Sequence, residues 1–184
     1  MGPLRVGAAA VATCAIALTA AGCVSTGTEP PGDPASTNAT VEWVSDGDTL
    51  RLTNGRKVRL LQIDAPENGT DCYGRDATRT LIGLTPKGTR ITLEADRSLD
   101  DKDTYGRLLR YVLVDGANVN LELVAQGAAA PYFFRKERGR YADALLDAAK
   151  TARNEHRGFW KACPDAELNP GLGSVTGPVS HQGR

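Results

Sequence analysis

The 184-residue sequence has only two histidines, His156 and His181, and no closely spaced pair of cysteines. Structural zinc sites are usually built from such residues, so a zinc site is not expected. An excess of charge is also absent, because 22 basic residues balance 22 acidic ones. A strongly basic chain would point directly to nucleic acid, and that argument does not apply here. Function must therefore be inferred from local groups of residues.

The main apolar run is too short to span a bilayer comfortably. It is the Ala-rich stretch 6–20, which follows Arg5 and is followed by the small residues Ala21 and Gly22. This pattern is typical of an export signal over residues 1–22. Because Cys23 comes next, the pattern favours a bacterial lipoprotein with Cys23 as the lipidated N-terminus. Ordinary secretion is the alternative, because Ala20 stands where the best lipoprotein signals carry leucine.

Segments poor in apolar residues flank one domain-sized segment. Residues 23–38 are rich in Pro, Gly, Ser and Thr, which is typical of a flexible tether. Residues 165–184 have a similar composition, which predicts a disordered C-terminal tail. The segment 39–164 has the size of a single domain and contains no internal repeat. We expect an exported protein, held on the outer face of the cell membrane through Cys23 or secreted.

Two cysteines remain in the predicted domain once the signal and Cys23 are set aside, namely Cys72 and Cys163. An exported domain lies in an oxidising compartment, where a lone pair of cysteines is more often a disulfide than two free thiols. A bond between them would close most of the domain into one loop. The alternative is a pair of buried thiols that pack as small apolar side chains.

Hydrophobic periodicity predicts five strands, at 41–45, 49–53, 57–63, 89–95 and 107–114. Asn54-Gly55 predicts a tight turn between the second and third strands. Helical spacing predicts three helices, at 73–84 with Asp71 as its cap, 119–126 and 138–155. Short strands with a helix inserted between the third and fourth favour an α+β fold. That fold is a five-stranded Greek-key barrel of the oligonucleotide-binding kind (OB-fold) with three helices.

Charged residues gather where predicted strands end. In Asp46-Gly47-Asp48-Thr49 a turn explains Asp46 and Gly47, whereas the turn does not need Asp48. Arg59 lies inside an apolar strand that ends at Asp64-Ala65-Pro66-Glu67, and a buried charge is costly without a partner. Arg59, Asp64 and Glu67 therefore form a candidate site, provided that the strand ends or bends near Ile63. The alternative is an arginine–carboxylate pair that only ties the strand end.

Two further clusters add arginine and aromatic residues. Asp103-Thr104-Tyr105-Gly106-Arg107 enters the fifth strand, and Pro131–Lys136 mixes aromatic with basic residues. Such mixtures suit base stacking beside phosphates, although core aromatics next to a solvated basic face explain the second cluster equally well. Carboxylates without His or Cys suit Ca²⁺ or Mg²⁺. Two arginines can bind the oxygens of a phosphate, and a glutamate can deprotonate an attacking water.

These clusters resemble the signature blocks of the staphylococcal nuclease-like (thermonuclease) family. Order and spacing agree from about Val41 to Cys163. The matching blocks are Asp46–Thr49, Arg59–Glu67, Tyr73-Gly74, Tyr105–Arg107, Val119–Gly127 and Gly158–Trp160. The resemblance implies a five-stranded OB-fold barrel with three helices, and Ca²⁺-dependent cleavage of DNA and/or RNA to products that end in 3′-phosphates.

The resemblance also implies roles by position. Asp48, Asp64 and the backbone carbonyl of Ala65 are the implied Ca²⁺ ligands, and Ala65 stands where the family commonly has Thr. The implied catalytic residues are Arg59, Glu67 and Arg107. Tyr105 and Tyr132 are the implied nucleotide contacts. Thr104 and Phe134 stand where a family member has a lysine and a tyrosine, so nucleotide affinity is the property that these departures affect.

Two other functions compete with a nuclease. One is a catalytically weak OB-fold module that binds nucleic acid or protein at the cell envelope, and the other is a structural spacer. A domain that has lost the chemistry should lack at least one of the five implied charged residues. All five are present, namely Asp48, Arg59, Asp64, Glu67 and Arg107. The sequence thus favours an active nuclease, which we expect to be a monomer.

Overall fold

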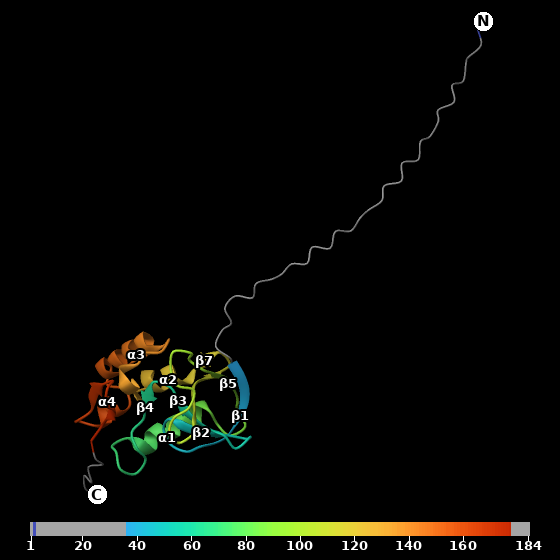
Figure 1. The fold of residues 1–184 in the computed structure, drawn as a ribbon. Coiled ribbons are helices and arrows are strands. Elements are labelled where there is room, and N and C mark those ends of the chain that lie inside the picture. The colour runs from blue at the N-terminus through green and yellow to red at the C-terminus, as the bar shows by residue number, and fades with distance from the viewer. Residues whose placement is uncertain (1, 3–35, 178–184) are drawn as a thin grey trace. The chain divides into compact units, whose positions relative to one another are not determined.

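The computed structural model describes residues 36–177, together with Gly2 (Figure 1). The predicted export signal, apart from Gly2, and the tether as far as residue 35, including Cys23, lie outside the described residues. Within the described residues, no helix has both the length and the apolar character needed to cross a bilayer.

Five strands close into a barrel, as predicted. They are β1 (Ser36–Val44), β2 (Thr49–Leu52), β3 (Lys57–Leu60), β5 (Arg90–Glu94) and β6 (Leu108–Val114). The spatial order is β3-β2-β1-β5-β6, and β7 (Ala117–Asn118) extends the sheet beside β6. Neighbouring strands are antiparallel, and a parallel pairing of β3 with β6 closes the barrel. Because the barrel is closed, the backbone N–H and C=O groups of β3 and β6 pair with each other instead of forming open sheet edges.

The barrel begins earlier than the sequence predicted. Residues 36–40 pair with β5 across the register Ser36↔Glu94 to Thr40↔Arg90, although the predicted tether extended to Asn38. Their composition is polar because this end of β1 is exposed. The prediction failed here because composition reports burial, whereas β5 supplies backbone hydrogen bonds to exposed residues as well.

All three predicted helices are present, as α1 (Gly74–Leu84), α2 (Val119–Ala125) and α3 (Ala142–Asn154). A four-residue helix, α4 (Phe159–Ala162), and a short 3₁₀ helix, η1 (Phe134–Lys136), are additional. Asp71 does not cap α1. Its carboxylate accepts the backbone N–H of Glu67 instead, and the residue before the helix is Tyr73 in a left-handed conformation.

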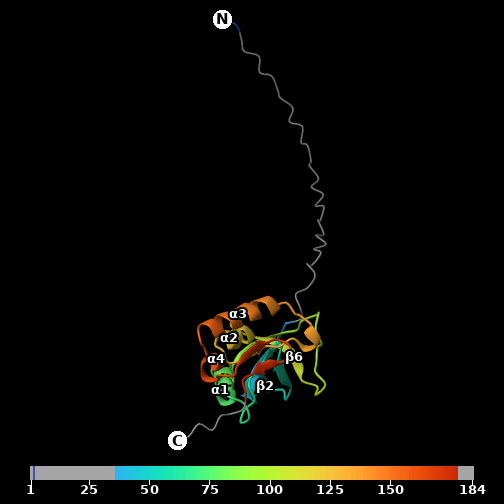
Figure 2. The same cartoon turned by 90° about the vertical axis from the view of Figure 1, so that its left-hand side faces the viewer.

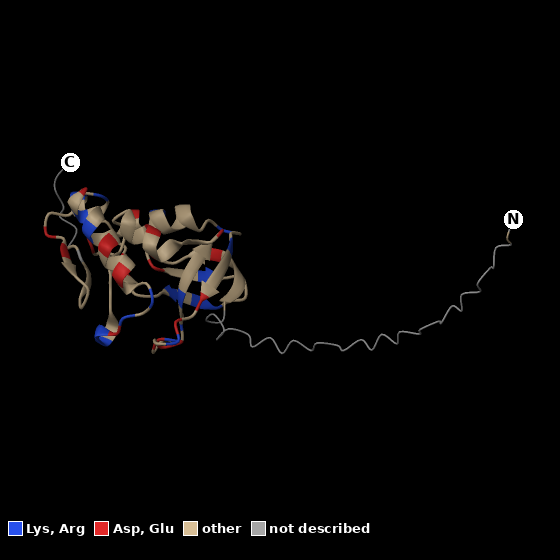
Figure 3. Cartoon of the chain, turned by 90° about the horizontal axis from the view of Figure 1, so that it is seen from above, with Lys and Arg blue, Asp and Glu red and all other residues tan. Residues whose placement is uncertain are grey.

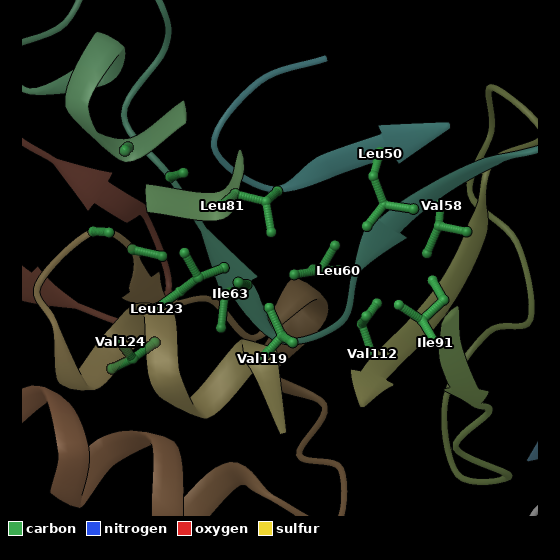
Figure 4. Packing of buried hydrophobic residues seen from close by; sticks show 14 of the residues in the cluster. Leu50, Val58, Leu60, Ile63, Leu81, Ile91, Val112, Val119, Leu123 and Val124 are labelled. Carbon is green, nitrogen blue, oxygen red and sulfur yellow. The ribbon is translucent and has the colours of Figure 1, made fainter. Parts of the chain in front are cut away.

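The hydrophobic core joins the barrel to the helices. Leu50, Val58 and Ile91 fill the barrel, while Leu81 of α1 and Leu123 of α2 extend the same cluster (Figure 4). Helix α2 contacts β6, α1 and α3, and therefore lies between the barrel and the outer helix (Figures 1 and 2). One continuous core therefore holds the helices against the barrel.

The segment after α4 is not the disordered tail that the composition predicted, at least to residue 177. Strands β9 (Glu167–Asn169) and β10 (Gly173–Val175) form an antiparallel hairpin. The hairpin contacts a second two-stranded ribbon, made of β4 (Ile63–Asp64) and β8 (Ala130–Pro131). Pro170 therefore belongs to the turn of this hairpin, and its backbone oxygen accepts the N–H of Phe133. Residues 178–184 lie outside the described residues.

The predicted disulfide between Cys72 and Cys163 is present, with 5.9 Å between the two Cα atoms. Cys72 lies just before α1 and Cys163 just after α4. Cys163 follows α4 rather than α3, because Gly158, with φ of 55°, separates the two helices. The bond thus fastens the C-terminal segment to the loop between β4 and α1.

Candidate functional site

The site depends on a bend that directly follows β3. The strand ends at Leu60, and Gln62 adopts a φ of 59°. The Gln62 side chain holds this strained backbone, because it donates to Glu137 O at 2.8 Å and accepts the N–H of Gly139 at 2.8 Å. The bend required to bring Arg59 and Asp64 together is therefore present. It lies at Gln62, next to Ile63, as the sequence required.

Arg59 bridges the two aspartates. Its Nε lies 3.0 Å from Asp48 Oδ1, and its Nη2 lies 2.8 Å from Asp64 Oδ1. Its Nη1 donates to the backbone oxygens of Leu60 and Ile63 at 2.9 and 2.7 Å. One guanidinium therefore ties the β1–β2 loop, which carries Asp48, to the end of the bent strand. The pairing of Arg59 with carboxylates, which the sequence left open as part of a site or as a tie at the strand end, is present.

Asp48 lies on the inner side of this cluster and is only 7% exposed. Its Oδ1 accepts the Thr49 hydroxyl at 3.1 Å, and its Oδ2 accepts the backbone N–H of Ala65 at 2.9 Å. Gly47 permits the approach, since an added Cβ would lie 2.5 Å from the Cβ of Ala65. Burial raises the pKa of the Asp48 carboxyl to about 7, and the charge of Arg59 opposes part of this rise.

Asp64 lies on the outer side and is held differently. Its Oδ2 accepts both the backbone N–H of Ser174, at 3.0 Å, and the Ser174 hydroxyl, at 2.9 Å. Ser174 belongs to β10, 110 residues away along the chain. The sequence-based site missed Ser174, because the contact is created by tertiary folding and no local motif surrounds this serine.

Arg107 approaches the cluster from the start of β6. Its Nε lies 2.5 Å from Asp103 Oδ2, and its Nη1 donates to the Thr49 hydroxyl oxygen at 3.4 Å. Thr49 thus connects Arg107 to Asp48. Burial raises the pKa of the Asp103 carboxyl, but hydrogen bonds from Arg107 and Tyr105 outweigh it and lower the pKa below its ordinary value. Asp103 therefore stays ionised and orients the Arg107 side chain.

Glu67 lies in the loop before α1, on the exposed side of the cluster. Its backbone oxygen is 2.1 Å from where a Cβ on Gly74 would lie, so the glycine is needed for this close approach. Partial burial, followed by the charges of Asp46, Asp64 and Asp71, raises the pKa of Glu67 above its ordinary value. A carboxylate with a raised pKa is a stronger base than an ordinary one.

A pocket of about 340 Å³ adjoins the arginines. The four predicted site residues among its lining are Arg59, Tyr105, Arg107 and Tyr132, whereas Asp48, Asp64 and Glu67 do not line it. Tyr105 is 84% exposed, and the guanidinium carbon of Arg107 lies 5.4 Å from its ring centroid. Basic and acidic residues are interspersed along the described chain (Figure 3). The basic and aromatic character of the pocket therefore comes from the arginines and tyrosines that line it.

A hard cation fits the donor set only in part. Among the described residues, no three His, Cys, Asp or Glu side chains cluster closely enough for a metal. Each carboxylate oxygen accepts about two hydrogen bonds. Asp48 Oδ2 and Asp64 Oδ1 each receive one donor, whereas the other oxygen of each carboxylate receives two. One position remains on each aspartate, which suits a Ca²⁺ that keeps several waters.

The fold and the candidate site agree with the nuclease class that the sequence blocks indicated: a closed OB-fold barrel carries an arginine–carboxylate cluster at a strand end. The family model described as "Staphylococcal nuclease homologue" matches residues 57–162, which is more than half of the chain. The chain therefore belongs to the staphylococcal nuclease family, as its signature blocks indicated. The matched range contains Arg59, Asp64, Glu67 and Arg107 but stops before the β9–β10 hairpin.

Curated relatives carry nuclease names. Endonuclease YncB of Bacillus subtilis is 34% identical over 131 residues, covering 67% of this chain and 61% of that protein. An uncharacterized endonuclease of Haemophilus influenzae is 36% identical, covering 69% and 65%. Thermonuclease of Staphylococcus intermedius is 32% identical, covering 66% and 74%. The matches to three Bacillus subtilis relatives span 61%, 44% and 12% of those proteins.

Proposed function

We propose that this protein is a Ca²⁺-dependent nuclease that hydrolyses phosphodiester bonds in DNA and/or RNA and leaves 3′-phosphate ends. The observation that carries the proposal is the bridged cluster at the barrel end. Arg59 joins Asp48 to Asp64, and Thr49 joins Asp48 to Arg107. Family membership and the endonuclease names of relatives support the same reaction class.

The two arginines are the proposed phosphate ligands. Both line the pocket, and both are oriented by carboxylates, Arg59 by the two aspartates and Arg107 by Asp103. Guanidinium groups in this arrangement can donate to non-bridging phosphate oxygens, whose charge rises in the transition state. Because the carboxylates fix the guanidinium planes beforehand, little reorganisation is needed during the reaction.

Glu67 is the proposed general base. Its pKa is raised by partial burial and by nearby carboxylates, which makes it a stronger base toward a water molecule. In this step the water oxygen forms a bond to phosphorus, and its proton moves to the Glu67 carboxylate. The bond from phosphorus to the 5′ oxygen breaks, the 5′ oxygen takes a proton from solvent to become a hydroxyl group, and the phosphate stays on the 3′ side. Asp48, Asp64 and the Ala65 carbonyl would hold the Ca²⁺, which supplies Lewis-acid stabilisation of the phosphate charge.

Tyr105 and Tyr132 are the proposed nucleotide contacts, because both line the pocket that contains the arginines. An exposed ring such as that of Tyr105 can stack on any base, which suits cleavage without strong sequence preference. Phe134, also in the lining, can stack but lacks the hydroxyl group of a tyrosine. Substrate affinity therefore depends mainly on stacking and on the arginines.

Export is part of the proposal. A disulfide such as Cys72–Cys163 is stable in an oxidising compartment, which agrees with the signal-like residues 1–22. We propose that the mature protein is held at the outer face of the membrane by a lipid on Cys23. Mass spectrometry of the N-terminal peptide from membrane fractions would identify the acyl chains, and an unmodified Cys23 in the culture medium would indicate secretion instead.

A zymogram with DNA and with RNA tests the reaction itself. We expect cleared bands in Ca²⁺ and none after chelation. The Arg107→Ala variant, run on the same gel, controls for a contaminating nuclease. If the native protein retards DNA on a gel but never cleaves it, the domain is a binding module and the catalytic assignment is wrong.

A further inference from the structure

The β9–β10 hairpin is fastened to the rest of the domain at three places beyond its own strands. The Cys72–Cys163 disulfide holds the chain just before it. The backbone N–H of Cys72 donates to Gly177 O at 3.0 Å, just after it, and the N–H of Phe133 donates to Pro170 O at 2.7 Å at its turn. These bonds fix both ends and the tip of a segment that lies outside the range matched by the family model.

The hairpin is shaped to approach one carboxylate. Gly173 has a φ of 79°, and a Cβ on this residue would lie 2.5 Å from Asp64 Oδ2. Only glycine permits both this backbone conformation and this proximity. The next residue, Ser174, then donates twice to the same oxygen, through its N–H and its hydroxyl. Two consecutive residues are thus adapted to the position of Asp64.

Asp64 needs such support more than Asp48 does. Its side chain is 30% exposed, against 9% for that of Asp48, and it follows a bend on a two-residue strand. Without Ser174, the Asp64 carboxylate would keep one hydrogen bond from the described residues, the bond from Arg59. Because both Ser174 donors occupy Oδ2, the carboxylate is held with Oδ1 toward Arg59 and with one acceptor position open.

We propose that Ser174 is a positioning residue that orients Asp64 for cation binding. The inference rests on the proposed function, since it assigns Asp64 to a Ca²⁺ site. Outer partners that hold a ligating carboxylate affect metal affinity strongly, typically by about ten- to a hundredfold. The hairpin is then a supporting part of the metal site that lies outside the range matched by the family model.

Calorimetric titration of the metal-free, disulfide-bonded protein with CaCl₂ tests the proposal. We expect Ser174→Ala to weaken Ca²⁺ binding by about tenfold, the lower end of that range, because its backbone N–H remains. Ser174→Thr keeps the hydroxyl and should restore native affinity. Leu172→Ala, a 65% exposed neighbour in the hairpin turn, is the matched control and should bind as the native protein does. Metal-free melting temperatures should stay close to native in all three.

Gly173→Ala provides a second, independent variant. The added methyl group should push β10 away from Asp64, so both donors are lost and the affinity should fall further than in Ser174→Ala. Native-like affinity in both Ser174→Ala and Gly173→Ala would overturn the positioning role. Tighter binding in either would overturn it too, because the hairpin would then compete with the cation. If the native protein itself binds no Ca²⁺, the proposed metal dependence fails as well, and this outcome is distinct from equal binding by native and variant proteins.

Discussion

The two aspartates bridged by Arg59 occupy contrasting surroundings. Asp48, on the inner side, is buried, and its remaining partners are the neighbouring Thr49 and the backbone of Ala65. Asp64, on the outer side, is partly exposed, and its remaining partner is Ser174 from the C-terminal hairpin. Burial within the barrel positions the first carboxylate, whereas a distant segment positions the second.

Because of this difference, substitutions on the two sides should change the stability of the fold to different extents. Loss of an inner residue alters a buried charge cluster, which is costly to leave unbalanced. Loss of an outer contact frees a carboxylate that water can solvate, so its effect should fall mainly on cation binding. The inner carboxylate thus bears on both the folding of the barrel and cation binding, whereas the position of the outer one depends on the disulfide-anchored hairpin.

The largest expected effect is that of Asp48→Ala on Ca²⁺-dependent cleavage. The variant removes a proposed anionic ligand from a site with few protein ligands, so both cleavage and Ca²⁺ binding should be lost. Calorimetry with CaCl₂ measures the binding, and circular dichroism checks the fold. Undiminished Ca²⁺ affinity would place the metal elsewhere and would end the comparison between the two aspartates.

Arg107→Ala and Glu67→Gln should each lower kcat by roughly a hundred- to a thousandfold. In the proposed mechanism Arg107 acts on the phosphate charge and Glu67 on the water, so both effects should arise mainly in the transition state. Single-turnover cleavage of a short labelled DNA at saturating Ca²⁺ measures them. Neither residue bridges the two aspartates, so Ca²⁺ affinity should change much less than kcat. Near-native turnover in either folded variant would refute its assigned role.

Removal of the disulfide should affect the outer side selectively. The bond joins residues 91 apart in sequence, and the chain-entropy relation values a loop of this length at about 4–5 kcal/mol as an upper bound. Replacing both cysteines by serine should therefore lower the melting temperature by about 10 °C or more. Looser anchoring of the hairpin should also weaken Ca²⁺ binding. Thiol labelling of the denatured, non-reduced native domain should modify neither Cys72 nor Cys163.

The inner side should show a pH effect on stability when no metal is bound. Folding raises the pKa of Asp48 from an ordinary 3.8 to about 7, so the folded state binds the proton more tightly. This contribution is fully present below about pH 4 and is lost as the pH rises through about 7. Asp48→Asn, which is neutral throughout, should flatten the loss of stability between pH 5 and pH 8 by about 1–3 kcal/mol.

Chemical denaturation in the presence of a chelator measures this slope, and Asp64→Asn is the matched variant on the outer side. An unchanged slope in Asp48→Asn would show that the inner carboxylate does not experience the buried surroundings described here.

Tyr105→Ala should give the smallest effect. The ring is exposed and contacts Arg107 from outside the cluster, so its loss removes one stacking contact worth about 1 kcal/mol. We expect KM to rise about fivefold while kcat stays close to native, whereas Tyr105→Phe should retain native KM. A kcat loss comparable with that of Arg107→Ala would mean that Tyr105 takes part in the chemistry.

Sequence patterns predicted the barrel well for identifiable reasons. Alternating apolar residues and the Asn54-Gly55 turn fixed the positions of the strands, and the expected helices formed where one face is apolar. One error lies where a partner distant in sequence decides, because residues 36–38 became strand through pairing with β5. The other error is local, because Asp71 bonds to Glu67, four residues before it, rather than capping α1.

The sequence by itself determined the charged residues of the candidate site, the need for a bend between Arg59 and Asp64, and the cysteine pair. Each follows from a local rule: a buried charge needs a partner, strand residues alternate, and lone cysteines in an oxidising compartment pair. Only the tertiary structure decided that Gln62 makes the bend and that Ser174 reaches Asp64. Those contacts join segments 75 and 110 residues apart, and a local pattern carries no record of which distant backbone will supply the donor.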